Sequence, residues 1–256
     1  MPTVSAAVST HTGLRRDKNE DAYCVRPDLG LYLVADGMGG HAAGEVASRL
    51  AVDTIEAFVD DTRDSDLNRT WPFPYDTALS GDGNRLKAGF LLANRKIASA
   101  MADNATLRGM ATTASSVLVS ATGAVIAHVG DSRVYLWRAG AIRQLTQDHS
   151  WVGEQVRAGV LTDADARQHP WRNVVTRAIT GGEDPDADIE DIVLEKGDRL
   201  LICSDGLYTV VPPERIAAEI GAAKPLESMC DALIAAANDG GGPDNITVVV
   251  INVDVA

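Results

Sequence analysis

The sequence predicts an α+β fold in which antiparallel sheets are flanked by helices. The expected elements run in the order strands, two helices, strands, two helices and a final strand. This order lacks the regular alternation of strand and helix that a parallel sheet requires. Several short strand-like segments in the middle of the chain are also separated mostly by glycines, which is typical of antiparallel connections.

The first part of the chain predicts three strands and then two helices. The strands are expected where small, β-branched and apolar residues gather, at residues 4–9, 21–26 and 31–35. The short link Asp28-Leu29-Gly30 suits a hairpin between the second and third. Residues 44–59 and 84–101 carry apolar side chains at helical spacing, so each helix should bury one face. The polar, acidic residues 60–83 predict a long surface link with one aromatic anchor, at residues 71–74.

The second part returns to strands and ends on two helices and a strand. An antiparallel meander is expected from four β-rich segments, at residues 114–120, 124–129, 133–137 and 141–145. Residues 151–177 are amphipathic and polar, and they predict a small helical insertion over the sheet edge. The remaining elements expected are strands at 189–194 and 199–204, helices at 213–220 and 226–238, and a closing strand at 246–253.

The amino-acid composition limits the classes of protein to which this chain can belong. The 256 residues, 45% hydrophobic and 23% charged, suit one large domain or one domain with an insertion. A net charge of −13 argues against nucleic acid as the main partner, because phosphate backbones attract basic surfaces. The three cysteines lack metal-site spacing, Cys203 is expected to be a buried hydrophobe, and their odd number fits a reducing compartment. No signal peptide or membrane span is evident, so we expect a cytoplasmic protein.

Acidic residues stand where several of the expected strands begin or end. These residues are Glu20, Asp21, Asp36, Asp131, Asp205 and Asp244. Asp36 follows a strand expected to be buried, and the glycines after it, from Gly37 on, are expected to turn the chain sharply. Strand ends in stacked sheets cluster along one rim, so we expect these carboxylates to meet there.

Such a group of carboxylates predicts a metal site. Oxygen ligands without a cysteine or histidine cluster suit Mg²⁺ or Mn²⁺ rather than Zn²⁺. A shared carboxylate with others around it is the arrangement of a two-metal site, which can activate a bridging water and clamp a phosphoryl oxygen. The alternative for any single position is an ordinary Asp-Gly turn. Several such acids together argue against it, because they would repel one another without cations.

Five short motifs point to a known family. They are RDKNED at residues 16–21, DGMGG at 36–40, GDSR at 130–133, SDG at 204–206 and GPDN at 242–245. In this order they resemble the metal-dependent Ser/Thr protein phosphatases of the 2C type, bacterial branch, over residues 4–253. The resemblance implies one catalytic domain over residues 1–256. Its fold would be a four-layer α-β-β-α sandwich of two antiparallel sheets flanked by helices, with a small flap insertion and a binuclear Mn²⁺ or Mg²⁺ centre.

The resemblance also implies roles for the ligands of two ions. Asp36 would bridge both ions, and Asp205 and Asp244 would complete the first site. The carbonyl of Gly37 and the Glu20 side chain, directly or through water, would serve the second.

Other motif residues would support this centre. Arg16 matches the family's phosphate-binding arginine, whose guanidinium fork suits phosphate oxygens. The alternative is a solvated surface arginine. Asp21 is expected to support the ligands rather than bind metal, and the loops at the strand ends are expected to be held by Asp131, Arg133 and Asn245.

Residues 150–178, the flap segment, resemble the family's flap, which overlies the site and helps choose substrates. Its Trp151 and Trp171 are equally well explained as packing anchors. Thr106 stands where many bacterial members carry an aspartate for a third metal, and Asp103 nearby has the wrong register. A neutral hydroxyl is a poor replacement for a carboxylate on a divalent cation, so this sequence argues against a third ion.

The resemblance implies hydrolysis of phosphoserine and phosphothreonine in proteins by a hydroxide that bridges two Mn or Mg ions. No covalent intermediate is expected, since no nucleophilic Ser or Cys motif is present. We find no clear counterpart of the family's candidate general-acid histidine, and we interpret His41 and His149 as structural. The implied partners are phosphorylated proteins and a bacterial Ser/Thr kinase, and we expect a monomer. The alternatives are a non-catalytic phosphoprotein-binding scaffold and a small-molecule phosphatase.

Overall fold

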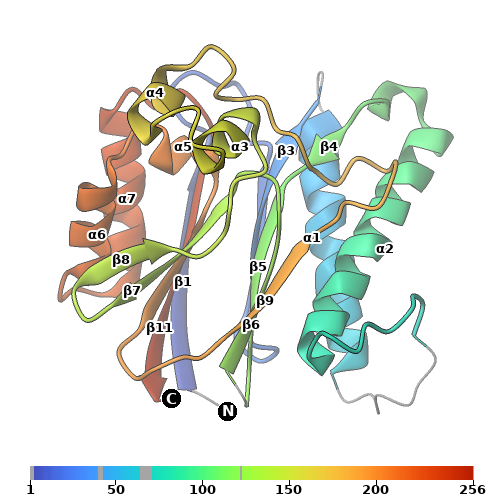
Figure 1. The fold of residues 1–256 in the computed structure, drawn as a ribbon, viewed down its shortest axis with the longest axis horizontal. Helices are drawn as coiled ribbons and strands as arrows, with labels where there is room; N and C mark the ends of the chain where they lie inside the picture. Colours follow the sequence, from blue (N-terminus) through green and yellow to red (C-terminus); the bar gives the residue numbers. More distant parts are fainter. Residues whose placement is uncertain (1–2, 40–42, 64–70, 122, 256) are drawn as a thin grey trace.

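The computed structural model describes residues 3–39, 43–63, 71–121 and 123–255. Two antiparallel sheets lie face to face, and a pair of long helices covers the outer face of each (Figure 1). The expected α+β class and the four-layer arrangement are confirmed.

The first sheet has the strand order β1-β11-β10-β7-β8, and every neighbouring pair is antiparallel. Its strands are β1 (Thr3–His11), β11 (Ile246–Val255), β10 (Arg199–Cys203), β7 (Arg133–Arg138) and β8 (Ala141–Gln144). Its outer face is covered by α6 (Pro213–Gly221) and α7 (Leu226–Asp239). The first and last strands of the chain are therefore direct neighbours in this sheet.

The second sheet has the order β2-β3-β5-β6-β9, with a short strand β4 paired to β3 beyond this path. Its strands are β2 (Asp21–Arg26), β3 (Leu31–Met38), β4 (Ala111–Thr112), β5 (Ala114–Ser120), β6 (Gly123–Val129) and β9 (Asp188–Ile192). Its outer face is covered by α1 (Ala43–Thr62) and α2 (Gly81–Asp103).

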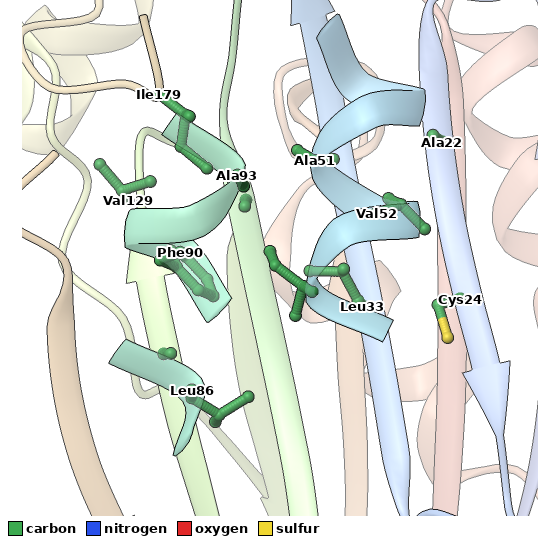
Figure 2. Close-up of a cluster of buried hydrophobic side chains, with 14 of the residues drawn as sticks. Ala22, Cys24, Leu33, Ala51, Val52, Leu86, Phe90, Ala93, Val129 and Ile179 are labelled. Carbon is green, nitrogen blue, oxygen red and sulfur yellow. The ribbon is translucent and has the colours of Figure 1, made fainter. Parts of the chain in front are cut away.

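Strand β3 shows how the sheets come to be buried on both faces. Leu31 and Leu33 point toward α1 and α2, whereas Tyr32 and Val34 point toward the other sheet. This alternation follows from the two-residue period of a strand. Figure 2 shows the outer cluster, where Phe90 of α2 packs above the sheet beside α1.

The short helices lie at one end of the sandwich (Figure 1). They are α3 (Trp151–Arg157), α4 (Asp163–Gln168), α5 (Asp205–Tyr208) and the 3-10 turn η1 (Ala105–Leu107). Helix α3 begins where the Ser150 side chain accepts a hydrogen bond from Gly153 N, and α4 begins with a reciprocal capping box between Thr162 and Asp165. The helical content expected of residues 151–177 is thus present.

Aromatic residues anchor two of the connecting segments. Trp71 makes edge contacts with Phe58 and Tyr75, as expected of the link before α2. In the flap segment, the Trp151 ring stacks on His169 at 4.7 Å between centroids, and Trp171 contacts it edge-on at 4.8 Å. Trp151 therefore does pack, while Trp171 stays 54% exposed.

The expected meander is wrong at its centre. Strands β5 and β6 belong to the second sheet, whereas β7 and β8 belong to the first. The chain changes sheets at Gly130, which has φ +107° and lies so close to Thr113 that an added Cβ would be 2.5 Å from it. The sequence could not show this, because a glycine between two apolar strands fits a hairpin and a crossover equally well.

The expected turn directly after Asp36 is also wrong. Strand β3 continues through Asp36 to Met38, because Gly37 pairs with Thr112 and Met38 with Ala111 of β4. Gly37 is needed for close approach, since an added Cβ would lie 2.1 Å from Gly44 O. Asp205, in contrast, does follow its strand, and it opens helix α5. Gly40 and His41 lie outside the described residues.

Candidate metal centre

The folded chain brings together the acids that the sequence places far apart. Asp21 lies directly opposite Asp36 in the register of β2 and β3. Burial raises the pKa of Asp36 well above its usual range, and four neighbouring carboxylates raise it further. These four belong to Asp21, Asp205, Asp131 and Asp244. The predicted convergence around Asp36 is therefore present.

The backbone of Asp36 is fixed by the chain that follows η1. Asp36 N donates to Thr113 Oγ1 over 3.1 Å, and Asp36 O accepts from Thr113 N over 2.9 Å. Thr112 Oγ1 donates to the same carbonyl over 2.8 Å. These bonds keep β3 extended beyond Ala35. They fix the backbone from which the Asp36 side chain projects.

The carboxylate of Asp205 has one oxygen that accepts no hydrogen bond from the described residues. Its Oδ1 atom is buried and has no hydrogen-bond partner among the described residues. Burial raises the pKa of Asp205 to about 6, and the charge of Asp244 adds to the rise. A buried carboxylate oxygen with no donor is costly unless a cation neutralises it.

One oxygen of Asp21 is held by two hydroxyls, which suits a supporting role, while its buried Oδ1 atom, like that of Asp205, has no hydrogen-bond partner among the described residues. Its Oδ2 atom accepts hydrogen bonds from Ser204 Oγ over 2.8 Å and from Thr247 Oγ1 over 2.7 Å. Burial raises the pKa of Asp21 to about 7, although these two hydroxyls oppose the rise. Asp21 thereby ties β2 to β10 and β11, next to Asp36.

Arg16 and Asp244 form an ion pair at the mouth of this group. Arg16 Nη2 lies 2.7 Å from Asp244 Oδ2, and the arginine side chain is half exposed. The hydrogen bond to Asp244 is the main reason that the pKa of Arg16 is raised. The turn before Arg16 packs against the same loop, since Leu14 N donates to Gly242 O over 2.7 Å. The phosphate-binding candidate and a metal-ligand candidate are thus in direct contact.

Glu20 and Gly37 lie together at the N-terminal end of α1. Gly37 N donates to Glu20 O over 3.2 Å, and the Glu20 carboxyl carbon lies so near Gly44 that an added Cβ there would be 2.9 Å from it. Burial is the main cause of the raised pKa of Glu20. Asn245 holds this segment, because its Oδ1 accepts from Glu20 N and its Nδ2 donates to Thr12 O and Lys18 O.

The loop that carries Asp131 is fixed by Arg133. The Arg133 guanidinium makes a two-pronged ion pair with Asp148, with distances of 2.9 and 2.6 Å. The same guanidinium lies 3.5 Å from the centre of the Tyr208 ring, and Tyr208 Oη donates to Asp131 O over 2.9 Å. Asp148 and Tyr208 were not singled out from the sequence, because nothing in their local sequence marks them as contacts of Arg133.

Two other residues singled out from the sequence make their printed contacts outside this group of acids. Thr106 is exposed, and its hydroxyl donates to Asn104 Oδ1 over 2.8 Å at the start of η1. His149 is fully buried, where its Nδ1 accepts from Gly130 N over 3.2 Å and its Nε2 lies 3.1 Å from Asp188 Oδ2. These contacts agree with a structural role for His149.

The acids fit divalent cations by chemistry and by electrostatics. All the donors are oxygens, which suits Mg²⁺ or Mn²⁺. Burial is the main cause of the raised pKa values of Asp36 and Asp205, and the neighbouring carboxylates add to the rise, so a cation at these acids would be favourable. Across the described ranges, however, no three His, Cys, Asp or Glu side chains already stand in a set that could hold an ion. The carboxylates would therefore have to move closer together to hold an ion.

Comparisons with known proteins give a consistent result. A model of the family described as protein phosphatase 2C matches residues 11–241. The chain is 35% identical to protein phosphatase PhpP of Streptococcus pneumoniae over 250 residues, 96% of each chain. It is similar to the crystal structure of the Mycobacterium tuberculosis serine/threonine phosphatase PstP/Ppp, with a TM-score of 0.86, 35% identity and coverage of 98% and 99%.

The chain is also similar to a second solved structure, with a TM-score of 0.79 and 34% identity over 97% of each chain. That structure is the catalytic domain of serine threonine protein phosphatase PstP in complex with 2 manganese ions. Separately, none of the helices in the described ranges has the length and apolar character needed to cross a membrane.

Proposed function

The chain belongs to the protein phosphatase 2C family and is a protein-serine/threonine phosphatase, and from this premise we propose how its own residues act. The substrates are phosphoserine and phosphothreonine side chains of proteins. The observation that supports the assignment most strongly is the convergence of Asp21, Asp131, Asp205 and Asp244 on Asp36, which raises the pKa of Asp36.

Two divalent cations, Mn²⁺ or Mg²⁺, would be held at this group of acids. Asp36 would bind both ions. One ion would also be bound by Asp205 and Asp244, and the other by Glu20 and the carbonyl of Gly37. The manganese complex of a relative supports two ions, and the absence of a carboxylate at Thr106 favours two over three. When bound, the ions supply an activated water and neutralise negative charge on the phosphate. Hydrolysis then proceeds without a covalent intermediate on the protein.

Arg16 orients the phosphate group. Among the described residues, Asp244 is bonded to only one guanidinium nitrogen of Arg16, Nη2, so the other N–H groups are free for phosphate oxygens. Asp21 positions the ligands through Ser204 and Thr247, because it links three strands of the two sheets at this end. The flap segment, residues 150–178, overlies the site and contributes to substrate choice.

We also propose a setting for this activity. The opposing enzyme is a bacterial Ser/Thr kinase, and the substrates are that kinase and its targets. The protein acts as a monomer in the cytoplasm. These proposals rest on the family resemblance.

The decisive experiment is phosphate release from a phosphothreonine peptide in the presence of Mn²⁺. We expect Asp36→Asn to lower kcat/KM by roughly a thousandfold, since it removes the charge shared by both ions. Asp53→Asn on the exposed face of α1 makes the same chemical change away from the site and should retain normal activity. Near-normal turnover in Asp36→Asn would refute the assignment.

Two controls separate the alternatives. EDTA should abolish phosphate release if the activity depends on metal. A nucleotide monophosphate assayed beside the peptide should be the poorer substrate. A protein that binds the peptide but releases no phosphate would be a scaffold, and a preference for the nucleotide would indicate a small-molecule phosphatase.

A further inference from the structure

A large cavity lies beside the candidate metal centre, between the flap segment and the first sheet. Its volume is about 530 Å³, which is within the usual range for a ligand-binding site. Asp131 and Asp205 line it on the side of the metal centre, and α3 and α4 line it on the side of the flap. Figure 1 shows these two helices above β7 and β8, with α5 beside α3. A substrate that reaches the metal centre can therefore extend into this cavity.

Three arginines of the flap segment line the same cavity. They are Arg157 at the end of α3, Arg167 at the end of α4 and Arg172 in the loop that follows. Arg157 Nη1 donates to Asp148 O over 2.9 Å, so this side chain has an anchor. The Arg167 and Arg172 side chains make no ion pair or hydrogen bond with any residue that the structure describes. In a chain with a net charge of −13, three arginines on one wall are a distinct local positive charge.

The nearby acids in the described ranges make their contacts with other groups and form no ion pair with Arg167 or Arg172. Asp148 is held by the two-pronged ion pair with Arg133 and by Gln144 Nε2 over 2.9 Å. Asp165 accepts from Thr162 within the capping box of α4. Glu154 Oε1 accepts from Thr176 Oγ1 over 2.7 Å. Among the residues that the structure describes, the guanidinium groups of Arg167 and Arg172 thus have no charged partner at this wall.

We propose that Arg167 and Arg172, supported by Arg157, bind a second phosphate group on the same substrate chain. Guanidinium groups suit phosphate because their planar N–H donors match two phosphate oxygens at once. The first phosphate would be at the metal centre, beside Asp205, and the second at the arginine wall of the same cavity. The preferred substrates are accordingly segments with two phosphorylated residues close in sequence. This inference rests on the proposed phosphatase function and adds a substrate class to it.

The test compares a singly phosphorylated peptide with a set of doubly phosphorylated peptides. The first carries one phosphothreonine, and each of the others carries the same phosphothreonine and a phosphoserine placed two to five residues away on one side or the other. We expect kcat/KM for phosphothreonine hydrolysis to be about five- to tenfold higher for the best doubly phosphorylated peptide. The preference should weaken as salt is raised, because exposed charges are screened.

Matched variants test whether Arg167 and Arg172 cause the preference for doubly phosphorylated peptides. The double variant Arg167→Gln/Arg172→Gln should bring the ratio of the two kcat/KM values close to one. Arg49→Gln, which removes an exposed arginine on α1, should keep the wild-type ratio. Thermal melting of each variant shows that it is folded before the ratios are compared.

A binding measurement makes the outcome independent of turnover. Fluorescence anisotropy with labelled peptides in EDTA should show tighter binding of the doubly phosphorylated peptide to the wild type, and loss of this difference in Arg167→Gln/Arg172→Gln. Equal affinities and equal kcat/KM values for both peptides in the wild type would overturn the inference. If neither peptide is hydrolysed with Mn²⁺, the proposed function fails, while the anisotropy result still decides whether the arginine wall binds a second phosphate.

Discussion

At the scale of single residues, Gly37 shows how a motif glycine can be required by packing and not by a turn. It continues strand β3, and a Cβ at this position would lie 2.1 Å from Gly44 O and 2.6 Å from Glu20 O. Backbone atoms cannot move aside as a flexible side chain can. The approach of β3 to the start of α1 therefore depends on the missing side chain.

We expect Gly37→Ala to lower the free energy of unfolding by about 3 kcal/mol, since it forces apart backbone segments that touch. Gly89→Ala in α2 is the matched control, because its Cβ would lie at an ordinary 3.6 Å from Ile55. This control should be neutral or more stable by about 0.5–1 kcal/mol, as alanine favours a helix over glycine. Urea unfolding measures both, and equal effects would contradict the steric argument.

His128 is a second residue whose surroundings set a measurable property. It is 1% exposed, with Nδ1 2.8 Å from Ser115 Oγ and Nε2 3.0 Å from Gln147 O. Burial lowers the pKa of His128 to about 4, and the adjacent His149 ring lowers it further. The imidazole is therefore neutral in the folded protein at neutral pH.

This depressed pKa predicts that His128 itself stabilises the fold less in mild acid. The unfolded chain takes up the His128 proton near pH 6.5 and the folded chain only near pH 4. The contribution of His128 to stability therefore falls by up to roughly 3 kcal/mol as the pH decreases from about 6.5 to 4, while the buried acids with raised pKa values, such as Asp21, act in the opposite direction. Melting temperatures of the wild type and of His128→Gln at pH 7.5 and pH 5 isolate the histidine. The wild type should lose more stability, or gain less, than His128→Gln on going to pH 5, and equal changes in the two proteins would contradict this prediction.

At the scale of elements, the two long helices α1 and α2 hold the second sheet by a continuous apolar contact. Phe90 of α2 is fully buried in this cluster, with Leu86 and Ala93 on the same helix face (Figure 2). A ring of this size removed from a close-packed site leaves a cavity that the neighbours fill only in part.

We accordingly expect Phe90→Ala to lower the free energy of unfolding by about 3–5 kcal/mol. Val193→Ala is a suitable comparison, because Val193 is 76% exposed and its truncation should cost less than about 0.5 kcal/mol. Chemical denaturation followed by far-ultraviolet circular dichroism distinguishes the two. A small effect for Phe90→Ala would mean that α2 contributes little to the stability of the sheet.

At the scale of the whole molecule, the candidate metal centre is made from distant parts of the chain. Asp36 comes from the second sheet, while Asp205 and Asp244 lie at the ends of strands in the first. A cation held by all three would join the two sheets and would also relieve the repulsion among their carboxylates. Metal binding should therefore stabilise the whole fold, because the unfolded chain does not hold these acids together.

The melting temperature should rise with Mn²⁺ concentration and return to its starting value with EDTA. A concentration 100 times the Kd would add about 2.7 kcal/mol to the free energy of unfolding. The Asp36→Asn variant should show a much smaller rise, whereas Asp53→Asn should respond as the wild type does. No shift at millimolar Mn²⁺ would contradict a cation site at these acids.

The sequence by itself determined most of the elements, because their signals are local. The apolar run of β3, the helical spacing of α1 and α2, and the motifs around Asp36, Asp205 and Asp244 were all readable along the chain. Most element boundaries differ from the expected ones by only a few residues, since the ends of strands and helices depend on their neighbours.

Only the tertiary structure decided which segments meet. The partners of a strand are set by hydrogen bonds between distant residues, so neither the change of sheet at Gly130 nor the pairing of Gly37 with β4 was visible. The ion pair of Arg16 with Asp244 spans 228 positions, and the cavity beneath the flap arginines is formed from several separate segments. Such contacts depend on packing and charge in three dimensions, which no local pattern encodes.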